Sequence, residues 1–258
     1  MLDDLIKILI CIVLCLPACS TDPKKETEGW SPEKLYSTAK DALDSGDYQS
    51  AIKYYELLEG HYPFDKLAQQ GQVEMIYAYY KFEEPESALA AANRFIKLYP
   101  RHPHVDYVYY LKGLVNFELT QGVFDRFLPL DRSQRDQDSA KTSFQDFSEL
   151  VKQFPQSKYA QDSRQRMIYL RNTLADYELN VAKFYMVRGA YLAAANRAKT
   201  IIESYPQTPG VSEALAILAK AYKIMGLNEL SHDTLSVLKL NYPHYKGIDE
   251  VEKVVLRD

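Results

Sequence analysis

The sequence predicts an all-α fold, a right-handed superhelical solenoid of five tetratricopeptide-like helix pairs. An aromatic-proline pair recurs five times along the chain, and small residues recur at set positions before most of these pairs. Such self-similarity is the signature of a repeat architecture. The chain also has only 10 glycines in 258 residues, which disfavours a turn-rich β fold.

The aromatic-proline pairs mark the ends of helices. They are Tyr62-Pro63, Tyr99-Pro100, Phe154-Pro155, Tyr205-Pro206 and Tyr242-Pro243. Their prolines are 37, 55, 51 and 37 residues apart, and each follows an apolar segment of helical period. Because proline cannot continue a helix, each pair is expected to close the second helix of one repeat.

The first, second, fourth and fifth repeats share one pattern of core and turn residues. Ala51, Ala88 and Ala194 each stand 12 residues before the closing proline, where a small residue lets two helix backbones approach closely. The positions expected in the core are Leu35, Ala39, Ala42, Tyr55 and Leu58 in the first repeat, Tyr79 and Phe95 in the second, Ala182, Tyr185, Ala198 and Ile201 in the fourth, and Leu215, Leu218, Ala219, Tyr222 and Leu238 in the fifth. Gly46, Glu84-Pro85, Gly189 and Gly226 are expected in the turns between paired helices.

The third repeat is split. Helices are expected at about residues 105–119 and 139–153, with Gly113 at the close contact and an insertion over residues 120–138. The insertion combines aromatic residues with the charged run 131–136, so it is either a contact surface or a loop that packs its own aromatics. The long interval before the fourth proline predicts an extended helix over residues 158–187, which lacks proline and glycine.

The first residues indicate the compartment. Residues 8–16 form an apolar run too short to span a bilayer, and Leu16-Pro17-Ala18-Cys19 resembles a bacterial lipobox. Residues 1–18 are then a lipoprotein signal peptide, Cys19 is lipidated, and residues 19–30 are a flexible tether. By resemblance to known lipoprotein sorting, Ser20 after the cysteine favours transfer to the outer membrane, so we expect the protein to be lipid-anchored on the periplasmic face of that membrane. A cleaved ordinary signal or a buried apolar helix are the alternatives.

No sequence pattern indicates a catalytic or metal-binding site. Phosphate loops, zinc-binding helix motifs and nucleophile elbows are absent from the sequence, and the five histidines are scattered. We expect no enzyme activity, no cofactor and no metal. The formal net charge of −4 gives no drive toward nucleic acid, which we do not expect as a partner.

The 21 tyrosines suggest a binding surface. Tyr77, Tyr79 and Tyr80, and then Tyr107, Tyr109 and Tyr110, lie on first helices of neighbouring repeats. Adjacent side chains on a helix point about 100° apart, so all three of a cluster cannot be core. At least one of each cluster should face a groove in which its amphipathic ring can hold a peptide.

Several segments together resemble the BamD (ComL) family of outer-membrane assembly lipoproteins. They include Tyr62-Pro63-Phe64, residues 76–81, Asp131-Arg132-Ser133 with Arg135-Asp136, Asp146-Phe147, Arg188-Gly189-Ala190 and Asn196-Arg197. Residues 244–258 depart from this resemblance.

The resemblance implies a non-enzymatic subunit of the machinery that folds and inserts outer-membrane β-barrels. Its partners would be the barrel-forming subunit BamA, other Bam lipoproteins, unfolded barrel precursors and the membrane itself. Residues 31–104 would form repeats 1–2 on the substrate side, 105–156 repeat 3 with its insertion, 157–246 repeats 4–5 on the partner side, and 247–258 a tail.

Candidate sites follow from the resemblance and from the tyrosines. Substrate contacts are expected at Tyr62, Tyr79, Tyr80 and Tyr110, and partner contacts at Arg132, Arg135, Arg188 and Arg197. A surface ion pair is the alternative for Arg197. Two other functions stay open, a repeat lipoprotein that scaffolds envelope or peptidoglycan enzymes, and a glycan-binding or hydrolytic solenoid.

Overall fold

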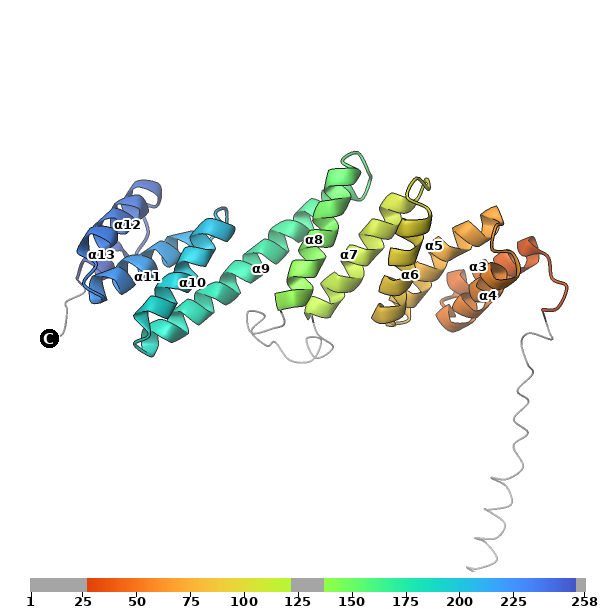
Figure 1. Cartoon of the computed structure of the whole chain (residues 1–258), viewed down its shortest axis with the longest axis horizontal. Coiled ribbons are helices and arrows are strands. Elements are labelled where there is room, and N and C mark those ends of the chain that lie inside the picture. Colours follow the sequence, from red (N-terminus) through yellow and green to blue (C-terminus); the bar gives the residue numbers. More distant parts are fainter. Residues whose placement is uncertain (1–26, 122–136, 254–258) are drawn as a thin grey trace, which may run out of the picture. The chain divides into compact units, whose positions relative to one another are not determined.

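A computed structural model describes residues 27–121 and 137–253, and every regular element in these ranges is an α-helix (Figure 1). The chain divides into two compact units, Met1–Gly71 and Gln72–Asp258. Cys19, Arg132 and Arg135 lie outside the described residues, as do the predicted signal peptide and most of the tether and insertion.

The first unit is built on α3 (Pro32–Ser45) and α4 (Tyr48–His61), followed by the start of α5 (Lys66–Lys81). Ser31 accepts a hydrogen bond from the Lys34 backbone N–H at 3.3 Å, and Pro32 occupies the first turn, so the start of α3 is set by its sequence. Gly46 ends α3 with φ 82°, a left-handed conformation that suits glycine.

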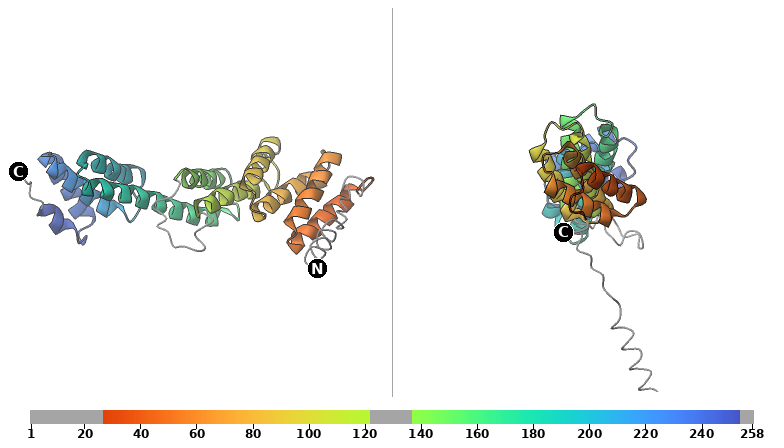
Figure 2. Two further views of the ribbon diagram at one scale, coloured as in Figure 1. Left: turned by 90° about the horizontal axis from the view of Figure 1, so that it is seen from below. Right: turned by 90° about the vertical axis from the view of Figure 1, so that its right-hand side faces the viewer.

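The second unit continues with α6 (Pro85–Leu98), α7 (Val105–Gln121), α8 (Gln137–Gln153), α9 (Ala160–Val187) and α10 (Tyr191–Ser204). It closes with α11 (Val211–Ile224), α12 (Asn228–Asn241) and the short α13 (Ile248–Glu252). Figure 2 shows α8 against α7 and α9, which it contacts extensively. The predicted all-α repeat architecture is confirmed, with the five predicted pairs at α3–α4, α5–α6, α7–α8, α9–α10 and α11–α12.

The aromatic-proline pairs end helices as predicted. Tyr62, Tyr99, Tyr205 and Tyr242 are the C-caps of α4, α6, α10 and α12, with φ between −127° and −135°. The residue before a proline avoids helical geometry, so these four caps share one conformation. Phe154 follows the last residue of α8.

Small residues form the contacts between helices. Ala51, Ala88 and Ala194 are fully buried, and so are Ala39 and Ala198. A Cβ at Gly113 would lie 2.5 Å from Cε1 of the buried Phe147, so only glycine lets α7 approach α8 this closely. These positions agree with the core expected from the repeat pattern.

The long predicted helix is α9, with 28 residues. Leu170 and Leu174 pack with α7 and α8, whereas Ala175, Leu179 and Ala182 pack with α10 and α11. Residues 247–258, expected to be a tail, include α13, whose Val251 is buried in the same core as α11.

Candidate functional site

Seven aromatic side chains associated with α5, α7 and α9 form a set that we call the aromatic row. Its members are Tyr77, Tyr80, Tyr107, Tyr110, Phe117, Tyr159 and Tyr169. Tyr159 stacks on two of them, with ring centroids 5.1 Å from Tyr107 and 4.7 Å from Tyr110. Offset stacking of this kind holds the rings in defined positions.

Tyrosine hydroxyls in the row link one first helix of a repeat to the next. Tyr80 on α5 donates to Glu118 Oε1 on α7 at 2.5 Å, and Tyr110 on α7 donates to Asp162 Oδ2 on α9 at 2.7 Å. Burial, and then the bond to Glu118, raises the pKa of Tyr80, and burial with the bond to Asp162 raises the pKa of Tyr110 to about 12. Both hydroxyls therefore stay protonated donors near neutral pH.

Arg166 lies among these groups. Its Nε donates to Asp162 Oδ2 at 2.6 Å, and its guanidinium carbon lies 4.7 Å from the centre of the Phe117 ring. Burial alone would raise the pKa of Asp162, but hydrogen bonds from Arg166 and Tyr110 outweigh it, so this pKa lies below its usual value. The carboxylate is thus an ionised acceptor that orients both partners.

The predicted substrate residues fall in different places. Tyr80 and Tyr110 belong to the aromatic row, and Tyr79 is half-buried on α5. Tyr62 lies in the first unit, where its hydroxyl donates to the Trp30 carbonyl at 2.7 Å. Trp30 in turn stacks on Tyr54 with ring centroids 6.0 Å apart.

Sequence reasoning did not single out Phe117, Tyr159 or Arg166. Asp162 and Arg166 are four residues apart, the spacing of a helical ion pair, and this was the one available signal. Their contacts with α7 join residues distant in sequence, which a repeat pattern alone does not reveal.

Two predicted partner residues belong to the α9–α10 pair, Arg197 within α10 and Arg188 in the turn between the helices. The Arg197 Nη1 donates to Glu178 Oε2 at 3.0 Å, and the Glu178 side chain is only 8% exposed. Arg188 follows α9, with its guanidinium 5.0 Å from the centre of the Phe184 ring. Phe184, Val187 and Leu192 are exposed apolar residues around this turn, and with Arg188 they form what we call the Arg188 patch.

The described ranges hold no group of three or more His, Cys, Asp or Glu side chains arranged to bind a metal ion. Of the helices that the structure describes, none combines the length and apolar character needed to cross a bilayer.

Paired helices with small residues at their contacts, together with an ordered aromatic row, define a helical-repeat protein of the tetratricopeptide class. The model of the YfiO family, described as an outer membrane lipoprotein, matches residues 29–238. The chain belongs to this family, whose curated relatives are named BamD.

Curated relatives cover almost the whole chain. The outer membrane protein assembly factor BamD of Neisseria gonorrhoeae is 45% identical over 243 residues, which is 92% of this chain and 91% of the relative. The BamD of Vibrio cholerae is 37% identical over 223 residues, 86% of this chain and 92% of the relative.

Solved structures are more distantly similar. The TPR domain of P58(IPK) is 14% identical with a TM-score of 0.44, covering 90% of this chain and 58% of that one. A tetratricopeptide repeat protein from Parabacteroides merdae is 16% identical with a TM-score of 0.38, covering 86% of this chain and 71% of that one.

Proposed function

We propose that this chain is a non-enzymatic subunit of the outer-membrane β-barrel assembly machinery. It binds unfolded barrel precursors and docks on the barrel-forming subunit BamA. Membership of the family, whose relatives are named outer membrane protein assembly factors, supports the setting. The observation that carries the binding role is the aromatic row with its bridging hydroxyl–carboxylate bonds.

The chemistry of the row supports precursor binding. An unfolded barrel precursor exposes extended segments with aromatic side chains and unpaired backbone groups, which aggregate when left uncovered. Rings that are already held by neighbours lose little side-chain entropy on binding. Tyr80, bonded to Glu118, and Tyr110, stacked on Tyr159, can therefore hold such a segment without folding it. We extend this role to Tyr79 and, within the first unit, to Tyr62, and we propose residues 31–104 as the substrate side.

Docking is assigned to the partner side, residues 157–246. The Arg188 patch offers exposed apolar surface beside a cation, with Val187 88% exposed and Leu192 65% exposed. Aromatic and arginine residues in such a setting are typical interface anchors. Arg197, and Arg132 and Arg135 in the insertion, complete the proposed contacts with BamA or other Bam lipoproteins.

The proposed anchor is the acylated Cys19, which holds the chain at the periplasmic face of the outer membrane. Several acyl chains give a stable anchor, at about 0.8 kcal/mol for each buried CH₂ group. Anchoring raises the effective concentration of bound precursor beside the insertion machinery. Mass spectrometry of the mature protein tests this, because an unmodified N-terminus would contradict it.

Site-specific photocrosslinking tests precursor binding. A photoreactive residue at position 80 or 110 is expected to capture an unfolded barrel precursor in cells. The matched control is position 98, since Leu98 on α6 is 56% exposed and lies outside the row. Capture at position 98 equal to that at both row positions would contradict the proposal.

Affinity purification from detergent-solubilised outer membranes tests docking. The wild-type chain is expected to retain an integral β-barrel subunit, and Val187→Ser with Leu192→Ser is expected to release it. Leu98→Ser is the control, because it makes the same kind of change at an exposed leucine outside the Arg188 patch. Recovery of a peptidoglycan enzyme without a β-barrel subunit would favour the scaffold function instead.

A further inference from the structure

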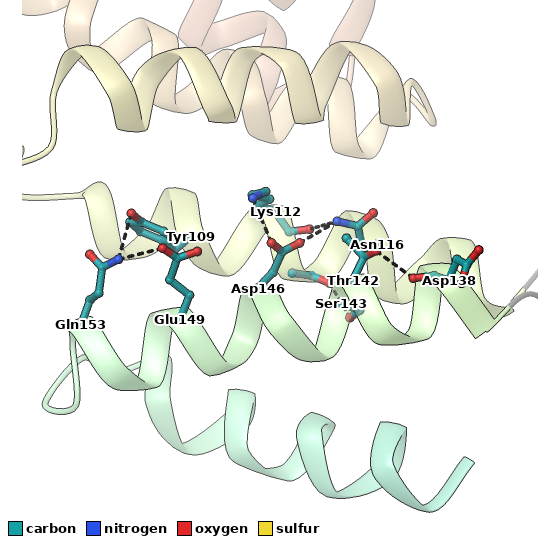
Figure 3. Close-up of polar contacts among 10 residues, drawn as sticks. Tyr109, Lys112, Asn116, Asp138, Thr142, Ser143, Asp146, Glu149 and Gln153 are labelled. Carbon is teal, nitrogen blue, oxygen red and sulfur yellow. Dashed lines mark hydrogen bonds and ion pairs between the residues drawn. The ribbon is translucent and has the colours of Figure 1, made fainter. Parts of the chain in front are cut away.

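The helices α7 and α8 are joined by a buried polar network (Figure 3). Asp146 on α8 uses both carboxylate oxygens. Lys112 Nζ lies 2.9 Å from Oδ1, and Asn116 Nδ2 donates to Oδ2 at 2.6 Å. The Asp146 side chain is 6% exposed, so the ion pair lies inside the helix pair.

Two further contacts between the helices lie beside this network. Ser143 Oγ, which is buried, donates to the Gly113 carbonyl at 3.0 Å. The Phe147 ring lies against Gly113, the position where a Cβ would clash. A shift of one helical turn, about 5.4 Å along the axis, would break all four contacts at once.

The connection between α7 and α8 differs from the other turns within repeats. The other four pairs are joined by two or three residues, 46–47, 82–84, 188–190 and 225–227. Between α7 and α8 lie residues 122–136. A short turn limits how two helices can slide past each other, whereas closing a long connection adds little constraint. The register of α7 against α8 must therefore be specified by the interface itself.

We infer that the Asp146 network fixes the register of α7 against α8, as a short turn does in the other repeats. We call this network the register lock. A buried ion pair adds little net stability compared with apolar packing. It does favour a single alignment of the two helices, because any other alignment leaves buried charges unpaired. Asp146 is then a positioning residue. It keeps the two residues that flank the insertion, Gln121 and Gln137, at a fixed position relative to each other. The consequence for docking rests on the proposed function, because Arg132 and Arg135 belong to that insertion.

The test replaces the network with apolar side chains of similar total volume, Lys112→Met, Asn116→Ala and Asp146→Val. Spin labels on α7 and α8 at positions 119 and 141, which are exposed, report the helix alignment by their distance distribution. The full chain is used with Cys11, Cys15 and Cys19 changed to serine, so that only the labels react. A label pair at positions 81 and 90, across α5 and α6, is the control for a repeat with a short turn.

The triple variant is expected to unfold at or above the wild-type temperature, with a broadened distance distribution at 119 and 141 and an unchanged one at 81 and 90. Replacing residues 122–136 by a three-residue turn in the same variant is expected to restore the narrow distribution. A narrow distribution in the triple variant would overturn the inference. If the triple variant does not fold, the distance between labels at 119 and 141 is measured in Asp146→Asn instead. An unchanged distribution in that variant would count against the lock.

Partner capture separates this inference from the proposed function. In otherwise unaltered, lipidated chains, the triple variant is expected to retain less BamA than wild type. Failure of the wild type to retain BamA would contradict the docking proposal and leave the distance result standing. Equal retention by the two chains, despite a broadened distribution, would remove the link between the lock and docking.

Discussion

Tyr110 shows how one side chain serves both the core and the exposed surface. Its ring packs near Phe147 with centroids 6.1 Å apart and stacks on Tyr159, while its hydroxyl reaches Asp162 on the next repeat. An amphipathic ring can do this because its body is apolar and its tip is a hydrogen-bond donor. The same side chain can therefore join repeats and line a binding surface.

The raised pKa of Tyr110 makes its contribution depend on pH. A group whose pKa is higher in the folded state stabilises the fold below its unfolded pKa, 10.0, and loses that contribution as pH rises through its folded pKa, about 12. Wild type is expected to exceed Tyr110→Phe in unfolding free energy near neutral pH, and the difference should shrink across this alkaline window. Urea denaturation of both chains measures it, and a constant difference would contradict the assignment.

Arg197 has a structural role that must be separated from docking. Arg197→Ala leaves the buried Glu178 carboxylate unpaired, so the unfolding free energy is expected to fall by about 1–3 kcal/mol. Adding Glu178→Ala should recover part of the loss. Lys199→Ala, which removes an exposed pair with Glu203 on the same helix, is the control and should have almost no effect. The measurement is chemical denaturation. An equal loss of unfolding free energy in Arg197→Ala and Lys199→Ala would rule out this role.

Sequence reasoning reached some of these residues and not others. The alanines, Gly113 and the aromatic-proline ends follow rules of helix geometry that act over short distances in the chain. The bond from Tyr80 to Glu118 and the bond from Asn116 to Asp146 join residues 38 and 30 positions apart, and each depends on how two helices are aligned. No local rule supplies that alignment, so the partners of Tyr80, Tyr110 and Asp146 came only from the structure.

At the scale of helices, the close approach of α7 and α8 depends on Gly113. Gly113→Ala would place a methyl group against the buried Phe147 ring, and overpacking of this kind lowers the unfolding free energy by about 1–3 kcal/mol. Gly60→Ala on α4 is the matched control, since nothing lies within 4 Å of the added Cβ. Better helix propensity should make the control neutral or slightly stabilising. Denaturation midpoints measure both, and equal midpoints would contradict the packing argument.

The ends of the helices, including those that flank the insertion, were predicted closely from the sequence. Prolines at 63, 100, 155, 206 and 243 limit where helices can continue, and α9 was expected over residues 158–187 and observed at Ala160–Val187. The insertion was expected at residues 120–138, and the flanking helices end at Gln121 and begin at Gln137. Its role as a contact surface stays a prediction.

At the scale of the whole molecule, α9 connects the packing of the second unit. Its Leu170 belongs to the core formed with α7 and α8, and its Ala175 to the core formed with α10 and α11. Because each repeat contacts mainly its neighbours, we expect this uninterrupted helix to couple the two cores into one cooperative structure, together with Tyr205, which packs against both.

Thr173→Pro tests this coupling. Proline in a helix interior removes a backbone hydrogen bond and destabilises by about 3 kcal/mol or more. The second unit is expected to unfold in two separate steps in this variant, whereas Thr173→Ala should keep the wild-type transition. Calorimetry distinguishes the outcomes, and a single transition in the proline variant would show that the cores are coupled by another route.

The bond from Tyr62 to the Trp30 carbonyl has a mechanical consequence. Tension applied through the proposed acyl anchor at Cys19 would reach α3 by way of Thr27 and Trp30, and Trp30 is bonded to Tyr62 at the end of α4 as well as linked to α3. The force would then be shared between two helices and act partly in shear, rather than peeling α3 away one turn at a time. If Cys19 carries the proposed lipid, Tyr62 would then spread the load at the start of the folded chain.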